Sequence, residues 1–221
     1  MINRKLILKV LILVCAVGIA AGCTKQVSPV ETPASISPAS PTPTSFTTFK
    51  NYPDQSFDVK GYTNGMTKGG HNLLIWKDSA INLSQYNSVK LTEFGGRLLP
   101  AQNEFSYDPY IALFNSVFKG SLKVPQKDSP DALLIEGAVV ECNPGSRTAR
   151  YMVGFGAGKA ACAVVCEVYE PGKPNPCIRI YSRDTASMGT FGGDSVRMLN
   201  NIMSVLGTRL ATSLNTTIVG G

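Results

Sequence analysis

The stretch RYMVGFGAGKAACAVV, residues 150–165, contains the residue types that could bind a phosphate. Its glycines alternate along the chain and are followed by a lysine: Gly154, Gly156, Gly158 and Lys159. A phosphate-binding loop has the pattern Gly-x4-Gly-Lys-Ser/Thr between a strand and a helix. Here the glycine spacing is too short, Ala160 replaces the magnesium-binding hydroxyl, and β-forming residues follow. We therefore interpret Arg150 and the three glycines as part of a connection into a strand, in which a Cβ would be unfavourable, and expect no nucleotide cofactor.

Four cysteines could form covalent links: Cys142, Cys162, Cys166 and Cys177. An exported compartment oxidises thiols, so this even number predicts two disulfides, with unpaired thiols as the alternative. Cys162 and Cys166 on one strand would lie about 13 Å apart, beyond the roughly 7 Å that a disulfide allows. We expect the pairs 142–162 and 166–177, because that register also places apolar residues of the two strands opposite one another. The spacings fit neither zinc knuckles nor a redox-active Cys-x-x-Cys.

Residues for acid–base or nucleophilic catalysis are scarce. His71 is the only histidine, and the sequence GGDS that ends at Ser195 resembles the nucleophile motif of one esterase class only superficially. Ser195 opens a predicted helix, where Asp194 or Ser195 serves as the N-cap. Glu136 and Glu141 are five residues apart on a predicted strand, so we expect them on opposite faces. No catalytic residue and no metal site is predicted.

The N-terminus carries a different chemistry, that of a lipid-modified cysteine. Arg4, Lys5 and Lys9 precede the uncharged residues 10–22, which are too few to span a bilayer at the roughly 20 residues required. Such a basic start and short apolar core are typical of a secretory signal peptide. The sequence AAGC that ends at Cys23 resembles the lipobox of bacterial lipoproteins. This resemblance implies cleavage after residue 22 and fatty chains on Cys23, and Thr24 in place of Asp implies the outer membrane.

The composition after Cys23 separates a linker from a folded part. Residues 28–48 are rich in Ser, Thr and Pro and nearly uncharged, which favours an extended tether rather than a core. We assign residues 1–22 to the signal peptide, 23–70 to the lipidated cysteine and tether, and 71–221 to one folded domain. The formal net charge is +6, but no block of Lys and Arg exists, which argues against a nucleic-acid partner.

The elements of this domain follow from periodicity. Residues 108–120 and 194–215 place apolar side chains three and four positions apart, which predicts two amphipathic helices. We expect strands over 88–94, 131–142, 159–170 and 177–187, the last three as a meander with a turn at 171–176. On the last strand, Arg179, Tyr181 and Arg183 are expected on a wet face. The predicted fold is α+β, a mostly antiparallel sheet with two amphipathic helices packed on one face.

This order of elements, with DALLIEGAVVE and then RYMVGFGAGKA, is similar to a family of bacterial lipoproteins known only as a domain of unknown function. In that family an Arg also precedes a Gly-x-Gly-x-Gly segment. The resemblance covers about residues 80–215. It implies a fold similar to the N-terminal domain of TolB and to the curli secretion lipoprotein, and it implies no reaction, ligand or catalytic residue.

The leading functional hypothesis is a non-catalytic lipoprotein of the bacterial cell envelope. We expect membrane lipid to be its partner through Cys23, and we expect it to dock with protein partners or to self-assemble. A binding module for a small hydrophobic or glycan ligand is the alternative, since such a module needs only an apolar pocket with a few polar groups. A hydrolase that uses His71 and Ser195 is a remote third.

Overall fold

The computed structural model describes residues 47–101, 105–145, 159–187 and 194–219. The compact unit begins at Ser45 and runs to the end of the chain. The expected cleavage site, Cys23 and the glycine segment lie outside the described residues.

The centre of the unit is a six-stranded sheet in the order β1-β2-β6-β5-β4-β3. The strands are β1 (Thr67–Gly70), β2 (Leu73–Lys77), β3 (Val89–Leu91), β4 (Leu133–Asn143), β5 (Ala160–Tyr169) and β6 (Pro176–Ala186). Neighbouring strands are antiparallel except β3, which runs parallel to β4. The expected α+β class and the β4–β5–β6 meander are confirmed. The hairpin β1–β2, at the other edge of the sheet, was not predicted.

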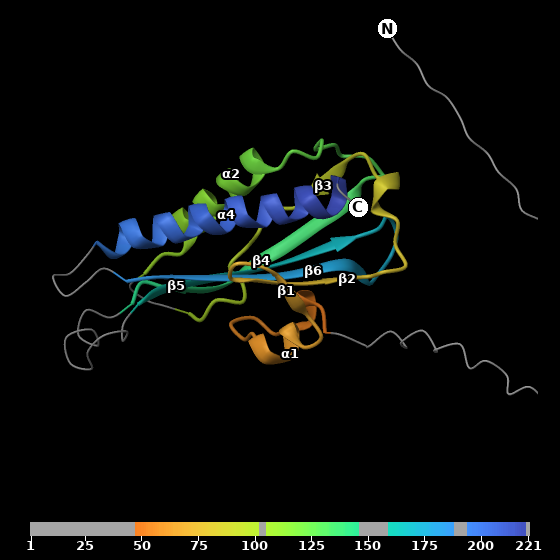
Figure 1. The fold of residues 1–221 in the computed structure, drawn as a ribbon. Coiled ribbons are helices and arrows are strands. Elements are labelled where there is room, and N and C mark those ends of the chain that lie inside the picture. Colours follow the sequence, from red (N-terminus) through yellow and green to blue (C-terminus); the bar gives the residue numbers. More distant parts are fainter. Residues whose placement is uncertain (1–46, 102–104, 146–158, 188–193, 220–221) are drawn as a thin grey trace, which may run out of the picture. The chain divides into compact units, whose positions relative to one another are not determined.

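Two helices, α2 (Asp108–Ser121) and α4 (Ser195–Val219), pack together on one face of the sheet (Figure 1). Pro109 stands in the first turn of α2, where its missing N–H has no helical partner to lose. The stripe predicted for α4 is buried throughout: Leu199, Ile202, Met203, Leu206, Leu210 and Leu214. Asp194 acts as the expected cap, since its carboxylate accepts the Val196 N–H at 2.9 Å. Of the helices described here, none is long and apolar enough to cross a bilayer.

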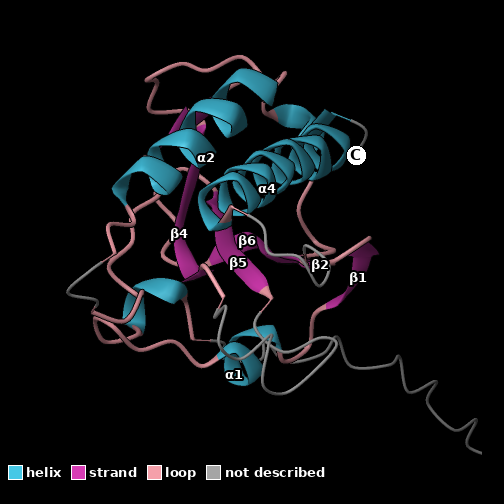
Figure 2. Cartoon of the chain, turned by 90° about the vertical axis from the view of Figure 1, so that its left-hand side faces the viewer, coloured by secondary structure: helices cyan, strands magenta, loops and turns pink. Residues whose placement is uncertain are grey.

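The opposite face of the sheet is covered by the chain that precedes β1. Residues 47–63, which we call the N-terminal strap, contain a 3-10 turn (Phe49–Asn51) and the short helix α1 (Val59–Thr63). Figure 2 shows α1 on the side of the sheet away from α2 and α4. Phe49 is 7% exposed and Tyr62 is fully buried. Residues 49–70, assigned above to the tether, are therefore part of the folded unit, because their aromatic side chains bury apolar surface that a tether could not.

Candidate functional site

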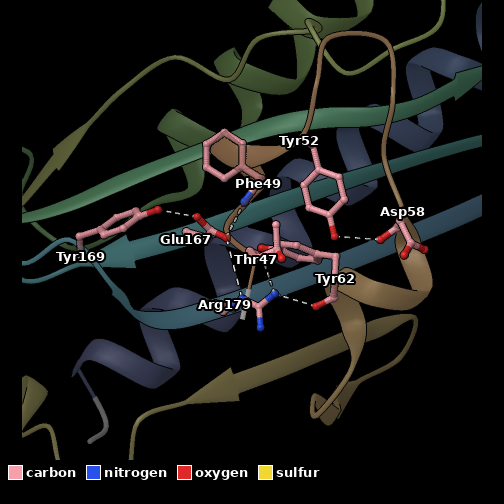
Figure 3. Close-up of polar contacts among 8 residues, drawn as sticks. All are labelled: Thr47, Phe49, Tyr52, Asp58, Tyr62, Glu167, Tyr169 and Arg179. Carbon is pink, nitrogen blue, oxygen red and sulfur yellow. Dashed lines mark hydrogen bonds and ion pairs between the residues drawn. The ribbon is translucent and has the colours of Figure 1, made fainter. Parts of the chain in front are cut away.

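The most unusual chemical feature of the structure is a fully buried charged pair on adjacent central strands. Glu167 of β5 and Arg179 of β6 are register partners, and both side chains are 0% exposed. Nε of Arg179 lies 3.9 Å from Oε1 of Glu167. Removing two charges from water costs several kcal/mol per ion, so such a pair is stable only when further hydrogen bonds satisfy both groups. Here the further partners come mainly from the N-terminal strap (Figure 3).

The pair binds the backbone of the strap at both of its ends. Oε1 of Glu167 accepts the Phe49 N–H at 3.0 Å. Nη2 of Arg179 donates to the carbonyl oxygen of Tyr62 at 2.7 Å and to that of Thr47 at 3.4 Å. The guanidinium also lies over the Tyr62 ring, 4.4 Å from its centroid, which adds a cation–π contact. One charged pair thus fixes the first and last turns of the strap.

A second arginine binds the middle of the strap. Arg97 lies in the chain between β3 and α2, and its Nη2 donates to the carbonyl oxygens of Phe49 and Lys50 at 2.9 and 3.1 Å. Its Nη1 donates to the carbonyl oxygen of Tyr52 at 2.8 Å and to Asp54 at 3.0 Å. Arg97 is more exposed than Arg179, so each of its bonds contributes less to stability. The strap is held by side chains from two separate parts of the fold.

Burial changes the acidity of the groups around the pair. Burial raises the pKa of Glu167 above its ordinary value, opposed by hydrogen bonds from Tyr169 and the Phe49 N–H and by the charge of Arg179. The Tyr169 hydroxyl donates to Oε2 of Glu167 at 2.5 Å. The pKa values of Tyr169 and Tyr62 are raised, first by burial and then by the nearby carboxylate. Both phenols therefore stay protonated at neutral pH, in the form that Tyr169 needs to donate its hydrogen bond.

The arrangement suits binding of backbone rather than turnover of a substrate. Both oxygens of Glu167 accept bonds from the protein itself, and the strap seals the pair from solvent. A general acid or base must reach a substrate proton at hydrogen-bond distance, and this carboxylate has no open side to do so. Among the residues that the structure describes, no three His, Cys, Asp or Glu side chains form a group that could hold a metal ion.

The residues weighed for catalysis are not brought together. His71 is exposed in the turn between β1 and β2, whereas Ser195 is the first residue of α4. Within the described ranges no hydrogen bond joins them. The expectation that Glu136 and Glu141 face opposite sides is wrong. A β-bulge between Val139 and Glu141 shifts the alternation of side chains by one residue, so both carboxylates lie on the face that the strap covers. There each is paired separately, Glu136 with Lys50 of the strap and Glu141 with Arg183.

The register of the strands is compatible with one of the two expected disulfides, 142–162, and not with the other. All four are buried free thiols. Cys142 and Cys162 are direct partners in the β4–β5 register, and a hydrogen bond between them raises the pKa of the Cys162 thiol. The β5–β6 register differs by three residues from the expected one, since Cys166 lies opposite Ile180. Cys177 instead donates to the Val168 carbonyl oxygen at 3.2 Å, so the pairing 166–177 does not fit this sheet.

The pair 142–162 stays a prediction that mass spectrometry checks. The protein secreted into an oxidising compartment is expected to weigh about two hydrogens less than the reduced protein, as one disulfide requires. Replacing Cys142 by serine abolishes this difference, whereas replacing Cys177 by serine leaves it. A loss of four hydrogens, or four alkylatable thiols in the unreduced protein, would contradict the assignment.

A shallow pocket of about 380 Å³ lies on the strap side near β2 and β6. It is lined by polar groups that include Asn72, Arg183 and Asp184. These groups already bind other parts of the protein: Arg183 binds Glu141 in two bonds of 2.6 and 2.9 Å, and Asp184 accepts from Arg209 at 2.6 Å. They leave little free hydrogen-bonding capacity for a ligand, which disfavours the binding-module alternative at this place.

Sequence reasoning missed the charged pair because it placed Arg179 on a wet face. The alternation along β6 is real, but the strap covers the polar side, so Arg179 and Tyr181 are 0% and 7% exposed. A signal was present in β5, where Glu167 is the only charged residue among ten. Aligning it with Arg179, the nearer of the two arginines on the next strand, gives the observed register, and directly opposed charges of opposite sign stabilise a sheet.

Comparison with known proteins gives a partial family match. Residues 115–200 match the model of a domain of unknown function, DUF4410. No curated protein matches the chain. Among solved structures it is similar to the PelC dodecamer from Paraburkholderia phytofirmans, at 9% identity and a TM-score of 0.39, over 62% of this chain and 96% of that one. It is also similar to a minor lipoprotein from Acinetobacter baumannii, at 13% identity and a TM-score of 0.36, over 60% and 95%.

The family match agrees with the expectation of a domain of unknown function. The expected Arg150 and glycine motif lies outside the described residues, and the similarity to TolB stays a prediction. The matched stretch runs from the middle of α2 to the start of α4 and contains both Glu167 and Arg179. The part of the chain that resembles this domain of unknown function thus contributes the buried pair that binds the strap, whereas Arg97 lies outside it.

Proposed function

We propose that this chain is a lipid-anchored, non-catalytic lipoprotein of the bacterial cell envelope, on the periplasmic side of the outer membrane, whose folded unit docks with a larger assembly. Cys23 in its lipobox-like context supplies the anchor. Two or three fatty chains hold a protein in a bilayer where one would not, since each buried methylene contributes about 0.8 kcal/mol. The composition of the residues that follow favours a tether.

The observation that best supports this proposal is the attachment of the strap to the buried pair of Glu167 and Arg179. The tether leads directly into Thr47 and Phe49, and these residues are bound by a charged pair with 0% exposure. At about 3.1 Å per residue for a proline-rich extended chain, residues 24–46 reach up to about 70 Å. A domain on such a tether can search a large volume while its first turn stays fixed to the sheet. An attachment of this kind suits a domain that is anchored through its N-terminus.

The anchor is tested by replacing Cys23 with alanine in cells fed a radioactive fatty acid. The label is expected to be lost and the protein to leave the membrane fraction, because no other residue supplies the lipidation site. Cys15→Ala is the matched control, since Cys15 lies in the predicted signal peptide, and it should keep the label. Label on the Cys23→Ala protein would refute the anchor.

The docking role is tested in the same membranes by chemical crosslinking. Wild-type protein is expected to give discrete bands of higher mass, either with partners or as multiples of itself, and the Cys23→Ala protein is expected to lose them. A wild-type chain that remains monomeric at every crosslinker concentration would refute docking and leave the anchor unaffected.

A further inference from the structure

The outer edge of β3 is open over part of its length. The Leu133 N–H donates to the Ser88 carbonyl oxygen at 3.2 Å, and the Thr92 N–H donates to the Ile135 carbonyl oxygen at 3.0 Å. In a parallel ladder the groups that face the partner strand alternate along the chain. The backbone groups of Val89 and Leu91 therefore face away from β4.

Only the first of these two residues has a partner on the outer side. The Val89 N–H donates to the Pro125 carbonyl oxygen at 2.9 Å, and the Val89 carbonyl oxygen accepts the Lys127 N–H at 2.9 Å. Residues 125–127 thus pair with Val89 like a short neighbouring strand, and the pairing does not continue to Leu91. Across the part of the chain that the structure describes, no backbone partner reaches the outer side of Leu91. An edge of this kind is a ready template for another extended chain.

A groove of about 560 Å³ lies directly beside this open edge. Its floor is β3, one wall is α2 with Asn115 and Lys119, and the other wall is the chain at 126–128. Asn115 joins this wall to the chain just after β3, since its side-chain amide accepts the Phe94 N–H and donates to the Phe94 carbonyl oxygen, both at 3.0 Å. These two bonds fix the α2 wall relative to the chain that follows β3.

The charges along the groove favour an acidic occupant. Three lysines line it, Lys90, Lys119 and Lys127, against two carboxylates, Glu93 and Asp128. Lys90 pairs with Asp128 at 2.6 Å. Lys119 and Lys127 are exposed and, among the described residues, are in no ion pair. They are available to a carboxylate that enters between the two walls.

We propose that this groove binds an extended peptide segment of a partner protein, which adds a strand beside Leu91 and places a carboxylate near Lys119 and Lys127. The inference rests on the proposed docking function and names its surface and the chemistry of the partner. Backbone hydrogen bonds to Leu91 supply affinity in this mode, and the alternate side chains of the segment supply specificity. A second copy of this chain is a poorer occupant through its exposed edge strand β1, because Lys68 of that strand would be repelled by the groove lysines.

The test uses the full lipidated chain in detergent and two synthetic heptapeptides. One peptide is acetyl-Thr-Val-Glu-Val-Glu-Val-Thr-amide with a fluorescent label, and the other has lysine in place of both glutamates. The acidic peptide is expected to bind at least tenfold more tightly, as followed by fluorescence anisotropy at low salt. Equal binding of the two peptides, or binding of neither, would overturn the proposal.

Two variants separate the backbone and charge contributions. Leu91→Pro removes the outward N–H and leaves the ladder to β4 unchanged, as proline on an edge strand allows. It is expected to weaken binding at least tenfold, whereas Leu91→Val keeps the N–H and should bind like wild type. The double variant K119E/K127E alters only exposed side chains and is expected to reverse the preference towards the lysine peptide. K60E/K173E, which alters exposed lysines outside the groove, should leave it unchanged.

Photo-crosslinking in membranes separates this inference from the docking proposal itself. With p-benzoylphenylalanine in place of Lys119, crosslinks to another polypeptide are expected, and with the same group in place of Lys173 they are not. If chemical reagents give crosslinked species but the photo-reactive group at position 119 gives none, the proposed peptide binding in the groove is refuted and the docking function is kept. Absence of crosslinks by both methods would refute both.

Discussion

Replacing Arg179 by methionine is expected to lower the free energy of unfolding by about 3–5 kcal/mol, the cost of leaving one member of a buried ion pair without its partner. Methionine keeps a flexible apolar side chain and removes the guanidinium, and with it the cation–π contact to the Tyr62 ring. Glu167 would then stay in an apolar environment with bonds from the Phe49 N–H and Tyr169 but without its opposite charge. Urea denaturation followed by circular dichroism measures the change, and Tm should fall by on the order of 10 °C.

The same variant is expected to release the strap before the rest of the fold. The carbonyl oxygens of Thr47 and Tyr62 lose their donor, so local opening of residues 47–63 becomes easier than global unfolding. Trypsin should then cleave after the exposed Lys60 faster than in the wild-type protein, under conditions where the sheet stays folded. N-terminal sequencing of the fragments identifies the cut.

Arg183→Met is the matched control, because Arg183 lies four residues further along the same face of β6 and also binds a glutamate. Its pair with Glu141 is partly exposed, with side chains 46% and 31% exposed, so its removal should cost at most about 1 kcal/mol. If Arg179→Met costs no more than Arg183→Met, the buried pair does not stabilise the strap. Adding Glu167→Leu to Arg179→Met should recover much of the stability and leave the strap open to trypsin.

Replacing Gly137 by alanine is expected to destabilise the protein by about 3 kcal/mol, at the upper end of the range for overpacked cores. A Cβ at this position of β4 would lie 2.1 Å from a ring carbon of Phe94 and 2.3 Å from the Val165 carbonyl oxygen. The ring cannot move easily, because Phe94 packs against Phe114 and Phe118 of α2. The carbonyl cannot move either, since it belongs to the central strand β5. Thermal unfolding should show a fall in Tm on the order of 10 °C.

Gly95→Ala provides the comparison for this variant. Gly95 lies beside β4, where its carbonyl oxygen accepts the Val139 N–H, and a Cβ there meets nothing within 4 Å. We expect its stability to stay within about 0.5 kcal/mol of wild type. Equal stability of the Gly137 and Gly95 variants would show that Phe94 does not pack closely on β4.

The sequence predicts the helices well because their signal is local. The spacing of the apolar residues in α4, and Asp194 before it, depend on neighbours within two turns. Both helices are therefore found at the expected places, and the helix ends agree within a few residues. The fold class follows, since such helices and a meander have few ways to bury their apolar faces.

The candidate site depends on contacts across the sequence and was not predictable in the same way. Phe49 and Glu167 are 118 residues apart, and no periodicity links them. The β5–β6 register was missed by three residues. The bulge beside Val168 accounts for one of them, and the other two arise because Tyr169 pairs with Pro176 and not with Pro174. The strap was missed because the tether was assigned to residues 23–70, although the Ser/Thr/Pro-rich composition ends at residue 48. The stretch that follows contains four buried or half-buried aromatic residues: Phe49, Tyr52, Phe57 and Tyr62.

The place at which the strap is fastened has a mechanical consequence. Glu167 and Arg179 belong to β5 and β6, the two middle strands of six, so tension along the tether would enter at the centre of the sheet. An attachment at β1 or β3 would instead let a pull peel the outermost strand away one hydrogen bond at a time. In the proposed anchored chain, central attachment would spread such tension over strands on both sides of the point at which it enters the sheet.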